Sequence, residues 1–157
     1  MASKTSEPRK FTPADAAFEQ RVRSSFARQR VMSTIGARLT SISPGEVVIE
    51  LPFREDLTQQ HGYLHAAITT AIVDSACGYA AYSLMPAEAA VLTVEYKVNF
   101  LAPAAGRRFV ACGRVLKPGR TLTVTTGEVV AETEAGQKPI AIMMATMMAV
   151  SSGELSG

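Results

Sequence analysis

Residues 59–86 read QQHGYLHAAITTAIVDSACGYAAYSLMP, and this stretch decides the fold. It is apolar over most of its length, rich in small residues, and holds no lysine or arginine. We predict one long helix here, because a continuous apolar surface is typical of a helix buried on all sides. Asp74 interrupts that surface near the middle. Burying an unpaired carboxylate costs several kcal/mol, so Asp74 is the first candidate for a functional residue.

Strand patterns lie on both sides of this helix. Before it we expect strands at 33–43 and 46–53, joined by a turn at Ser43-Pro44-Gly45. After it, four strand patterns follow at 91–101, 109–116, 121–131 and 140–150, with a tight turn at 117–120. This order predicts an α+β fold in which an antiparallel sheet of about six strands wraps around the central helix.

Two of these strands have informative faces. The strand at 91–101 alternates, with Leu92, Val94, Tyr96, Val98 and Phe100 on one face and Thr93, Glu95, Lys97 and Asn99 on the other. The last strand is apolar on both faces, so we expect it to be covered on both sides or to lie in an interface. Its methionines at 143–148 favour a core position over a binding groove.

An additional helix precedes the first strand. Thr12, Pro13 and Asp15 form a helix start, and an apolar stripe at helical spacing follows, so we predict a helix over 13–30. No repeat or linker is visible. We therefore expect a single domain over 1–157, with flexible tails at 1–10 and 151–157.

Composition excludes several classes of protein. The 157 residues are 47% hydrophobic and 19% charged, and the net charge of +2 is too small to indicate a nucleic-acid partner. The polar start lacks a secretory signal, and the helix at 66–85, with its central Asp74 and no basic flanks, is a poor membrane span. We interpret Cys77 and Cys112 as buried free thiols in a cytoplasmic protein.

The surroundings of Asp74 suit a ligand. Its neighbours about one turn away are small and leave room for a ligand or a partner helix: Thr70, Ala71, Cys77 and Gly78. The start of the helix, Gly62–Ala67, offers no Ser, Thr, Asp or Asn as a cap, so we expect unbonded N–H groups there. Such groups bind an oxyanion, and a carbonyl polarised by them can be attacked by a carboxylate or by water that the carboxylate activates.

His65 and Asp74 are both candidates, yet one straight helix separates them. Nine residues correspond to about two and a half turns and about 13 Å along the axis, so the two side chains point to opposite sides. Two antiparallel helices across a dimer axis would bring His65 of one chain to Asp74 of the other. The spacing therefore predicts a site shared by two chains.

Three runs of sequence carry a family resemblance. GYLHAA followed by VD, then VLTVEYKVNFLAPAAG, then GRTLTV resembles the hotdog-fold acyl-CoA thioesterases of the phenylacetyl-CoA (PaaI) type over about residues 46–150. The resemblance implies a long helix wrapped by an antiparallel sheet. It also implies a homodimer with two shared sites, often a dimer of dimers, that hydrolyses acyl-CoA thioesters. Nothing in the sequence implies a metal or a tightly held cofactor.

The resemblance also assigns candidate roles to single residues. It makes Asp74 the catalytic carboxylate and His65 the histidine at the helix start. Ala66 stands where the family has a glycine whose N–H polarises the thioester carbonyl, and Gln59 where relatives carry an asparagine near the water or the leaving group. Thr93 stands where a serine or threonine assists the carboxylate, but its strand face brings it there only if the strand twists or bulges.

Structural interpretations stand beside these roles. Asp74 can be an acid bonded within the fold, and His61 fits a structural or loop-supporting role. Three basic residues are candidates for gripping the phosphates of CoA: Arg114, Lys117 and Arg120. Arg107 and Arg108 fit an ordinary solvated rim.

Other functions stay open at this point. A non-catalytic acyl-CoA binding or sensor protein could use the same fold, although a binder has no need of a buried acid opposite a carbonyl-polarising helix end. A hotdog dehydratase fits less well, because such sites pair their Asp and His within one motif. No nucleophile elbow, zinc motif, phosphate loop or dinucleotide fingerprint is present.

Overall fold

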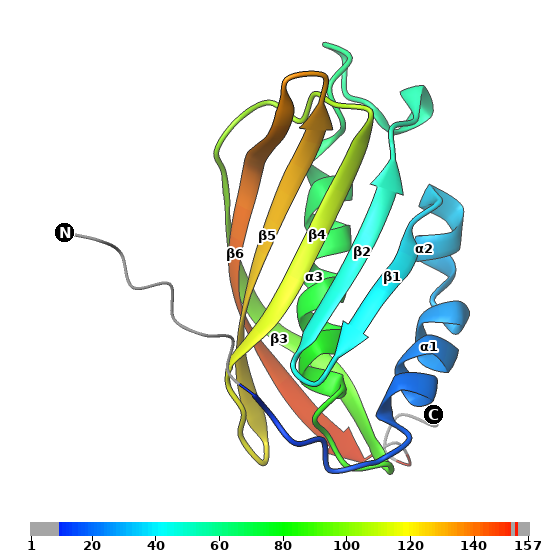
Figure 1. Cartoon of the computed structure of the whole chain (residues 1–157), viewed down its shortest axis with the longest axis vertical. Coiled ribbons are helices and arrows are strands. Elements are labelled where there is room, and N and C mark those ends of the chain that lie inside the picture. Colours follow the sequence, from blue (N-terminus) through cyan, green and yellow to red (C-terminus); the bar gives the residue numbers. More distant parts are fainter. Residues whose placement is uncertain (1–9, 152, 154–157) are drawn as a thin grey trace, which may run out of the picture.

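Six antiparallel strands curve around one long helix (Figure 1). This computed structural model describes residues 10–151 and 153, so most of the tails expected at 1–10 and 151–157 lies outside the described residues. The elements are α1 (Phe18–Arg28), α2 (Arg30–Ile35), β1 (Arg38–Ser43), β2 (Glu46–Pro52), a 3-10 turn (Glu55–Leu57), α3 (Ala66–Tyr82), β3 (Ala89–Phe100), β4 (Arg108–Lys117), β5 (Leu122–Thr133) and β6 (Gly136–Ser151). The predicted α+β hotdog fold with an additional N-terminal helix is confirmed.

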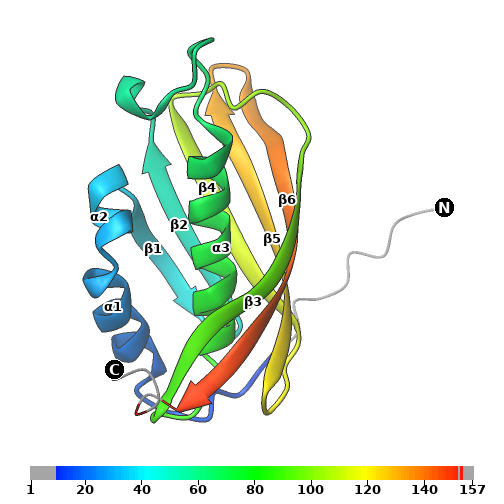
Figure 2. The same ribbon diagram turned by 180° about the vertical axis from the view of Figure 1, so that it is seen from behind.

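The chain order of the strands differs from their order in space. Across the sheet the order is β1-β2-β4-β5-β6-β3, and every neighbouring pair is antiparallel. After α3 the chain therefore crosses to the far edge of the sheet before it returns through β4, β5 and β6. Figure 2 shows α3 in the concave face of the sheet, with β3 forming one edge.

Two facing glycines let the sheet approach α3 closely. Gly113 of β4 and Gly127 of β5 are partners in the strand ladder. A Cβ added at Gly113 would lie 2.3 Å from the carbonyl carbon of Ala76, and one added at Gly127 would lie 2.4 Å from Cγ2 of Val73. Both distances are far shorter than the contact distance between carbon atoms, so only glycine fits at either position.

The first helix, α1, packs beside the second half of α3 (Figure 2). The Phe26 ring meets the Tyr79 ring edge-on, with 5.8 Å between the centroids. Arg21 donates a hydrogen bond of 3.2 Å to the carbonyl oxygen of Tyr82, and its Cζ lies 4.2 Å from the centroid of the Tyr82 ring. Since cations stabilise the negative end of a helix, Arg21 ties the N-terminal segment to the end of α3.

The N-terminal boundaries differ from the prediction. The helix expected over 13–30 begins only at Phe18 and stops at Gln29, where a ψ of 90° leaves the helical region. A second short helix then takes residues 33–35, which we had expected to be strand. Gly36 ends that helix with a φ of 80°, in the left-handed conformation that glycine adopts readily.

The two apolar faces of β6 differ in burial. Met143 and Met147 point toward α3 and are 2% and 0% exposed, whereas Ile142 and Met144 on the other face are 45% and 50% exposed. The expected cover is thus found on the inner face only. No helix in the described part of the chain is long and apolar enough to cross a membrane.

Candidate active site

A short loop sets the start of α3. The helix predicted over 59–86 begins only at Ala66, because residues 59–65 form a turn in which Gly62 has a φ of 81°. Backbone hydrogen bonds hold this turn on both sides: the N–H of Leu64 donates to the carbonyl oxygen of Ala104, and the N–H of His65 to that of Leu57. The loop is therefore fixed against the rest of the fold.

The histidine before the helix acts as its cap. Nδ1 of His65 accepts the N–H of Ala67 at 3.0 Å, and the carbonyl oxygen of His65 accepts the N–H groups of Ile68 and Thr69. The expectation of an uncapped helix was therefore wrong for these three donors. The expectation holds for the Ala66 N–H, which has no hydrogen-bond partner among residues 10–151 and 153.

The carboxylate of Asp74 is held by one hydroxyl. Thr93 Oγ1 donates to Oδ1 of Asp74 at 2.9 Å. No cation within the described residues forms an ion pair with Asp74. Burial raises the pKa of the Asp74 carboxyl above its usual range, and the hydrogen bond from Thr93 opposes part of that rise. Asp74 is thus a half-buried acid with a perturbed pKa, as general bases often are.

A bulge in β3 brings Thr93 to this position. Thr93 pairs with Met147 and Glu95 pairs with Thr146, so Val94 is the extra residue. The clean alternation that we predicted was therefore wrong. The bulge puts Thr93 on the inner face together with Tyr96, Val98 and Phe100, and it moves Leu92 to the outer face.

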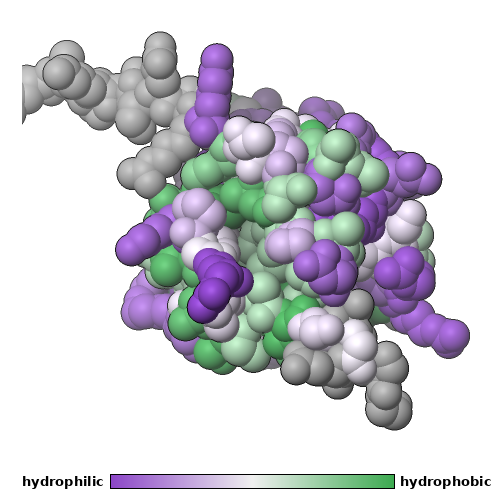
Figure 3. All heavy atoms as spheres, turned by 90° about the horizontal axis from the view of Figure 1, so that it is seen from below, coloured by the Kyte–Doolittle hydropathy of each residue, from purple (hydrophilic) through white to green (hydrophobic). Residues whose placement is uncertain are grey.

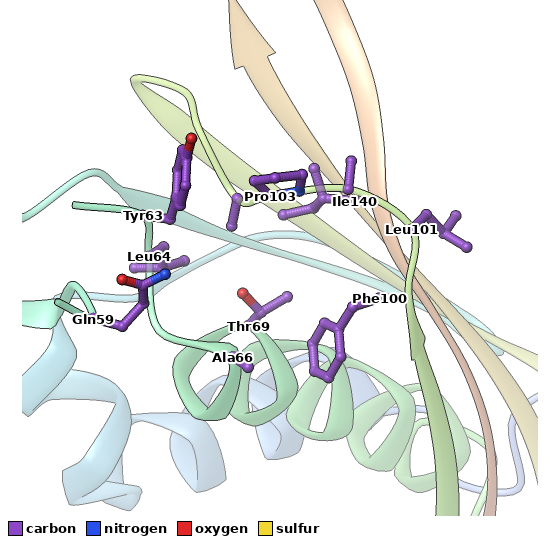
Figure 4. A pocket seen from close by; sticks show the side chains of 11 residues that line it. Gln59, Tyr63, Leu64, Ala66, Thr69, Phe100, Leu101, Pro103 and Ile140 are labelled. Atoms are coloured by element: carbon purple, nitrogen blue, oxygen red, sulfur yellow. The ribbon is translucent and has the colours of Figure 1, made fainter. Parts of the chain in front are cut away.

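A cavity opens at the start of α3, and we call it the helix-start cavity. Its volume is about 610 Å³. Its lining residues come from the 59–66 loop, the first turn of α3, the segment after β3 and β6: Gln59, Tyr63, Leu64, Ala66, Thr69, Phe100, Leu101, Ala102, Pro103, Ala104 and Ile140. Figure 4 shows the hydroxyl of Thr69 and the amide nitrogen of Gln59 turned toward its interior.

A second cavity contains the carboxylate, and we call it the Asp74 cavity. Its volume is about 350 Å³. The helices α1 and α3 and the start of β3 line it: Ser25, Arg28, Gln29, Asp74, Ser75, Gly78, Tyr79, Tyr82, Ala89, Ala90, Val91 and Thr93. Ser25, Arg28 and Gln29 were not predicted, because nothing in the N-terminal sequence indicates where that helix docks. The expected room around Asp74 is present at Gly78.

Within one chain the helix-start cavity and the Asp74 cavity are separate. They share no lining residue. Asp74 lies eight residues after Ala66, or about 12 Å along the helix axis. Among the predicted site residues, the structure places Asp74 with Thr93, and Ala66 with Gln59, while the ring of His65 caps the helix and lines neither cavity.

The basic candidates lie elsewhere on the chain. Arg114 forms an ion pair of 2.7 Å with Glu46. Lys117 ends β4 and Arg120 lies in the connection to β5, and both are exposed at the end of the molecule opposite the start of α3 (Figure 1). Figure 3 views that end and shows hydrophilic side chains around an apolar centre. On one chain these residues meet neither Asp74 nor Ala66, so their contact with phosphates stays a prediction.

The next candidates are the two cysteine thiols and possible clusters of metal-ligating side chains. Burial raises the pKa of Cys77 to about 12 and that of Cys112 to about 11, so neither is a thiolate at neutral pH. Cys77 is buried as expected, but Cys112 is only partly buried. Within the described residues, no group of three or more His, Cys, Asp or Glu side chains is placed to hold a metal ion.

Comparison with known proteins gives a consistent result. Residues 61–136 match the thioesterase superfamily. The crystal structure of a thioesterase family protein from Silicibacter pomeroyi is 56% identical, with 86% of this chain and 99% of that chain covered and a TM-score of 0.85. Acyl-coenzyme A thioesterase 13 of Homo sapiens is 32% identical over 101 residues, which cover 62% of this chain and 69% of that protein.

A more distant structure supports the architecture alone. The E. coli PaaI protein from the phenylacetic acid degradation operon is 19% identical, with 88% of this chain and 96% of that chain covered and a TM-score of 0.78. Ser25, Arg28 and Gln29, which line the Asp74 cavity, lie outside the matched residues 61–136.

Proposed function

This chain belongs to the thioesterase superfamily, and we propose that it hydrolyses acyl-CoA thioesters to a free acid and CoA at a site shared between two chains. The resemblance drawn from the sequence is thereby confirmed at the level of the family. The residues of the site and its sharing between chains are our proposal, and the geometry of the two cavities supports both.

Asp74 drives the reaction in this proposal. Its carboxylate either attacks the thioester carbonyl carbon or takes a proton from a water molecule that attacks it. In both routes the carbon–sulfur bond breaks and the thiolate of CoA leaves. Direct attack leaves the acyl group on Asp74 as an anhydride, which a water molecule hydrolyses to the free acid and the Asp74 carboxylate; in the other route the attacking water gives the free acid at once. Thr93 orients the carboxylate through its hydrogen bond, and the raised pKa makes the Asp74 carboxylate a stronger base than an exposed one.

The start of α3 stabilises the oxyanion. The Ala66 N–H lies at the positive end of the helix dipole and has no partner in the described part of the chain. His65 supports it by fixing the first turn through Nδ1. Gln59 presents its amide nitrogen near the leaving group, because its Oε1 already accepts the N–H of His61.

The edge strand supports a shared site. β3 is 12 residues long and pairs on one side only within residues 10–151 and 153, and apolar side chains along it are 41–52% exposed: Leu92, Val94, Tyr96 and Phe100. An uncovered edge of this kind favours pairing with another strand. A second copy that pairs antiparallel across a two-fold axis would lay the start of β3 beside the end of the partner's β3.

That pairing would place the Asp74 cavity of one chain beside the helix-start cavity of the other. The start of β3 lines the Asp74 cavity with Val91 and Thr93, whereas Phe100 at its end lines the helix-start cavity. In such a dimer Asp74 of each chain faces the Ala66 N–H of the other chain, which gives two equivalent sites. Single chains place these groups about 12 Å apart along one helix, which is too far for one reacting carbon.

One observation carries the proposal: a half-buried carboxylate that forms no ion pair with any described residue opens into a cavity beside small residues. Thiol release from a panel of acyl-CoA substrates tests it. Wild-type protein should hydrolyse at least one acyl-CoA, and Asp74→Asn should lower kcat by about a hundredfold or more, the usual scale for losing a general base. Binding without turnover in the wild type would instead make the protein an acyl-CoA binder.

A further inference from the structure

We propose that the hydroxyl of Thr69 binds an amide of the pantetheine arm of the substrate. The inference rests on the proposed function and adds a binding residue to it. The Thr69 side chain is 1% exposed, and its Oγ1 has no hydrogen-bond partner among the described residues. A buried hydroxyl without a partner destabilises the folded chain, so its presence calls for a function.

The neighbouring threonine shows what a structural hydroxyl does in this helix. Thr70 Oγ1 donates to the carbonyl oxygen of Ala66 at 2.9 Å, the bond that a helical threonine usually makes four residues back. Thr69 makes no such bond, although the carbonyl oxygen of His65 is at the corresponding position and accepts the Thr69 N–H. Its hydroxyl turns instead into the helix-start cavity (Figure 4).

The cavity around this hydroxyl is mostly apolar. Leu64, Phe100, Pro103 and Ile140 supply hydrocarbon, and Figure 4 shows their side chains around the space that the Thr69 hydroxyl faces. Gln59 and Tyr63 are the other polar side chains of the lining. A chain of methylene and methyl groups broken by amides fits such a lining, because each amide that leaves water needs a partner. Thr69 can donate to an amide carbonyl or accept from an amide N–H.

The openings of the two cavities decide which part of the substrate lies here. The nucleotide of CoA is large and charged, so the arm that leads to it must reach solvent. The rim of the helix-start cavity outside β3 is exposed, with Tyr63 at 39% and Leu101 at 52%. The Asp74 cavity is smaller and is walled by α1, which suits the acyl group. The arm therefore runs past Thr69.

Thr69→Val tests the inference, because it keeps the shape of the side chain and removes the hydroxyl. We expect KM for acyl-CoA to rise about fivefold to tenfold, the scale of one hydrogen bond to a buried neutral group, with little change in kcat. The melting temperature should rise at the same time, since an unpartnered buried hydroxyl is gone. Thr70→Val is the matched control and should leave KM unchanged, while Thr69→Ser should restore it.

Binding and truncated substrates separate the inference from the proposed function. A non-hydrolysable S-alkyl-CoA thioether keeps the arm and needs no catalysis, so its affinity should also fall fivefold to tenfold in Thr69→Val even if no thioester is turned over. An unchanged affinity would overturn the inference. The loss should be equal for different acyl groups and absent for an ethanethiol thioester, which has no amide. A loss that follows the acyl group would show that Thr69 contacts the acyl chain instead.

Discussion

Replacing Gly78 with alanine should stabilise the protein while narrowing the Asp74 cavity. Gly78 lies in α3 one turn after Asp74, and a Cβ added there meets no atom within 4 Å. In a helix interior, alanine is about 0.5–1 kcal/mol more favourable than glycine. For a chain of this size, that difference raises the melting temperature by about 1–4 °C.

The same methyl group should change which substrates are accepted. It projects into a cavity of about 350 Å³ that we assign to the acyl group. Since one methylene in a binding pocket is worth about 10–200-fold in kcat/KM, bulky acyl-CoA substrates should lose about tenfold or more. Acetyl-CoA, which leaves most of the cavity empty, should be affected little. Thermal unfolding and thiol release on a graded acyl series measure both effects.

Gly113→Ala is the matched control for this prediction. There the new Cβ would lie 2.3 Å from the carbonyl carbon of Ala76, so the substitution should destabilise by about 1–3 kcal/mol through overpacking. The two alanine variants should thus move the melting temperature in opposite directions. A lower melting temperature for Gly78→Ala would contradict the open space beside Gly78. An unchanged preference among acyl groups would refute our assignment of the Asp74 cavity to the acyl group.

Three further predictions concern Asp74, Thr93 and β3. Because burial raises the folded-state pKa of Asp74, ionisation costs stability above that pKa; Asp74→Asn should melt higher than wild type at pH 7 and show no such gain in acid, where the carboxyl is protonated in both states. Thr93→Val removes the bond that favours the charged carboxylate, so the acid limb of kcat/KM should move to higher pH, and a limb that stays in place would contradict the role of Thr93. Val94→Lys puts a charge on the exposed edge, and light scattering should then detect inactive monomers; a persisting active dimer would place the interface elsewhere.

The sequence predicted the architecture because the relevant signals are local. The apolar run around Asp74, the strand patterns after it and the turn at Gly45 each depend on residues close together in the chain, and the structure has the helix, the six strands and that turn. The tight turn expected at 117–120 is instead a connection over 118–121, because Lys117 still belongs to β4. The family resemblance rests on the same segments. These signals also selected Asp74 as the candidate acid.

Long-range contacts explain what the sequence did not predict. The bulge at Val94 reverses the face of Thr93, yet nothing in an alternating run shows where a residue will be left unpaired. The break at Gln29 and the docking of α1 place Ser25 and Arg28 in the Asp74 cavity, and both depend on contacts with α3. Thr69 and Thr70 look alike in sequence, and only the three-dimensional structure separates the bonded hydroxyl from the unpartnered one.

The shared site can be tested with two variants that each remove one half of it. Asp74→Asn removes the carboxylate. Ala66→Pro removes only the oxyanion N–H, because Ala66 is the first residue of α3, where proline is tolerated, and the φ of −63° and ψ of 139° at His65 suit a residue before proline. Each variant alone should be inactive.

Mixing the two variants is the most direct measurement of the central claim. After subunit exchange at equal concentration, half of the dimers should be mixed, and each mixed dimer holds one intact site that combines Asp74 of one chain with Ala66 of the other. We expect about a quarter of wild-type activity to return. No recovery, in a sample where mass spectrometry shows mixed dimers, would contradict a site shared between chains.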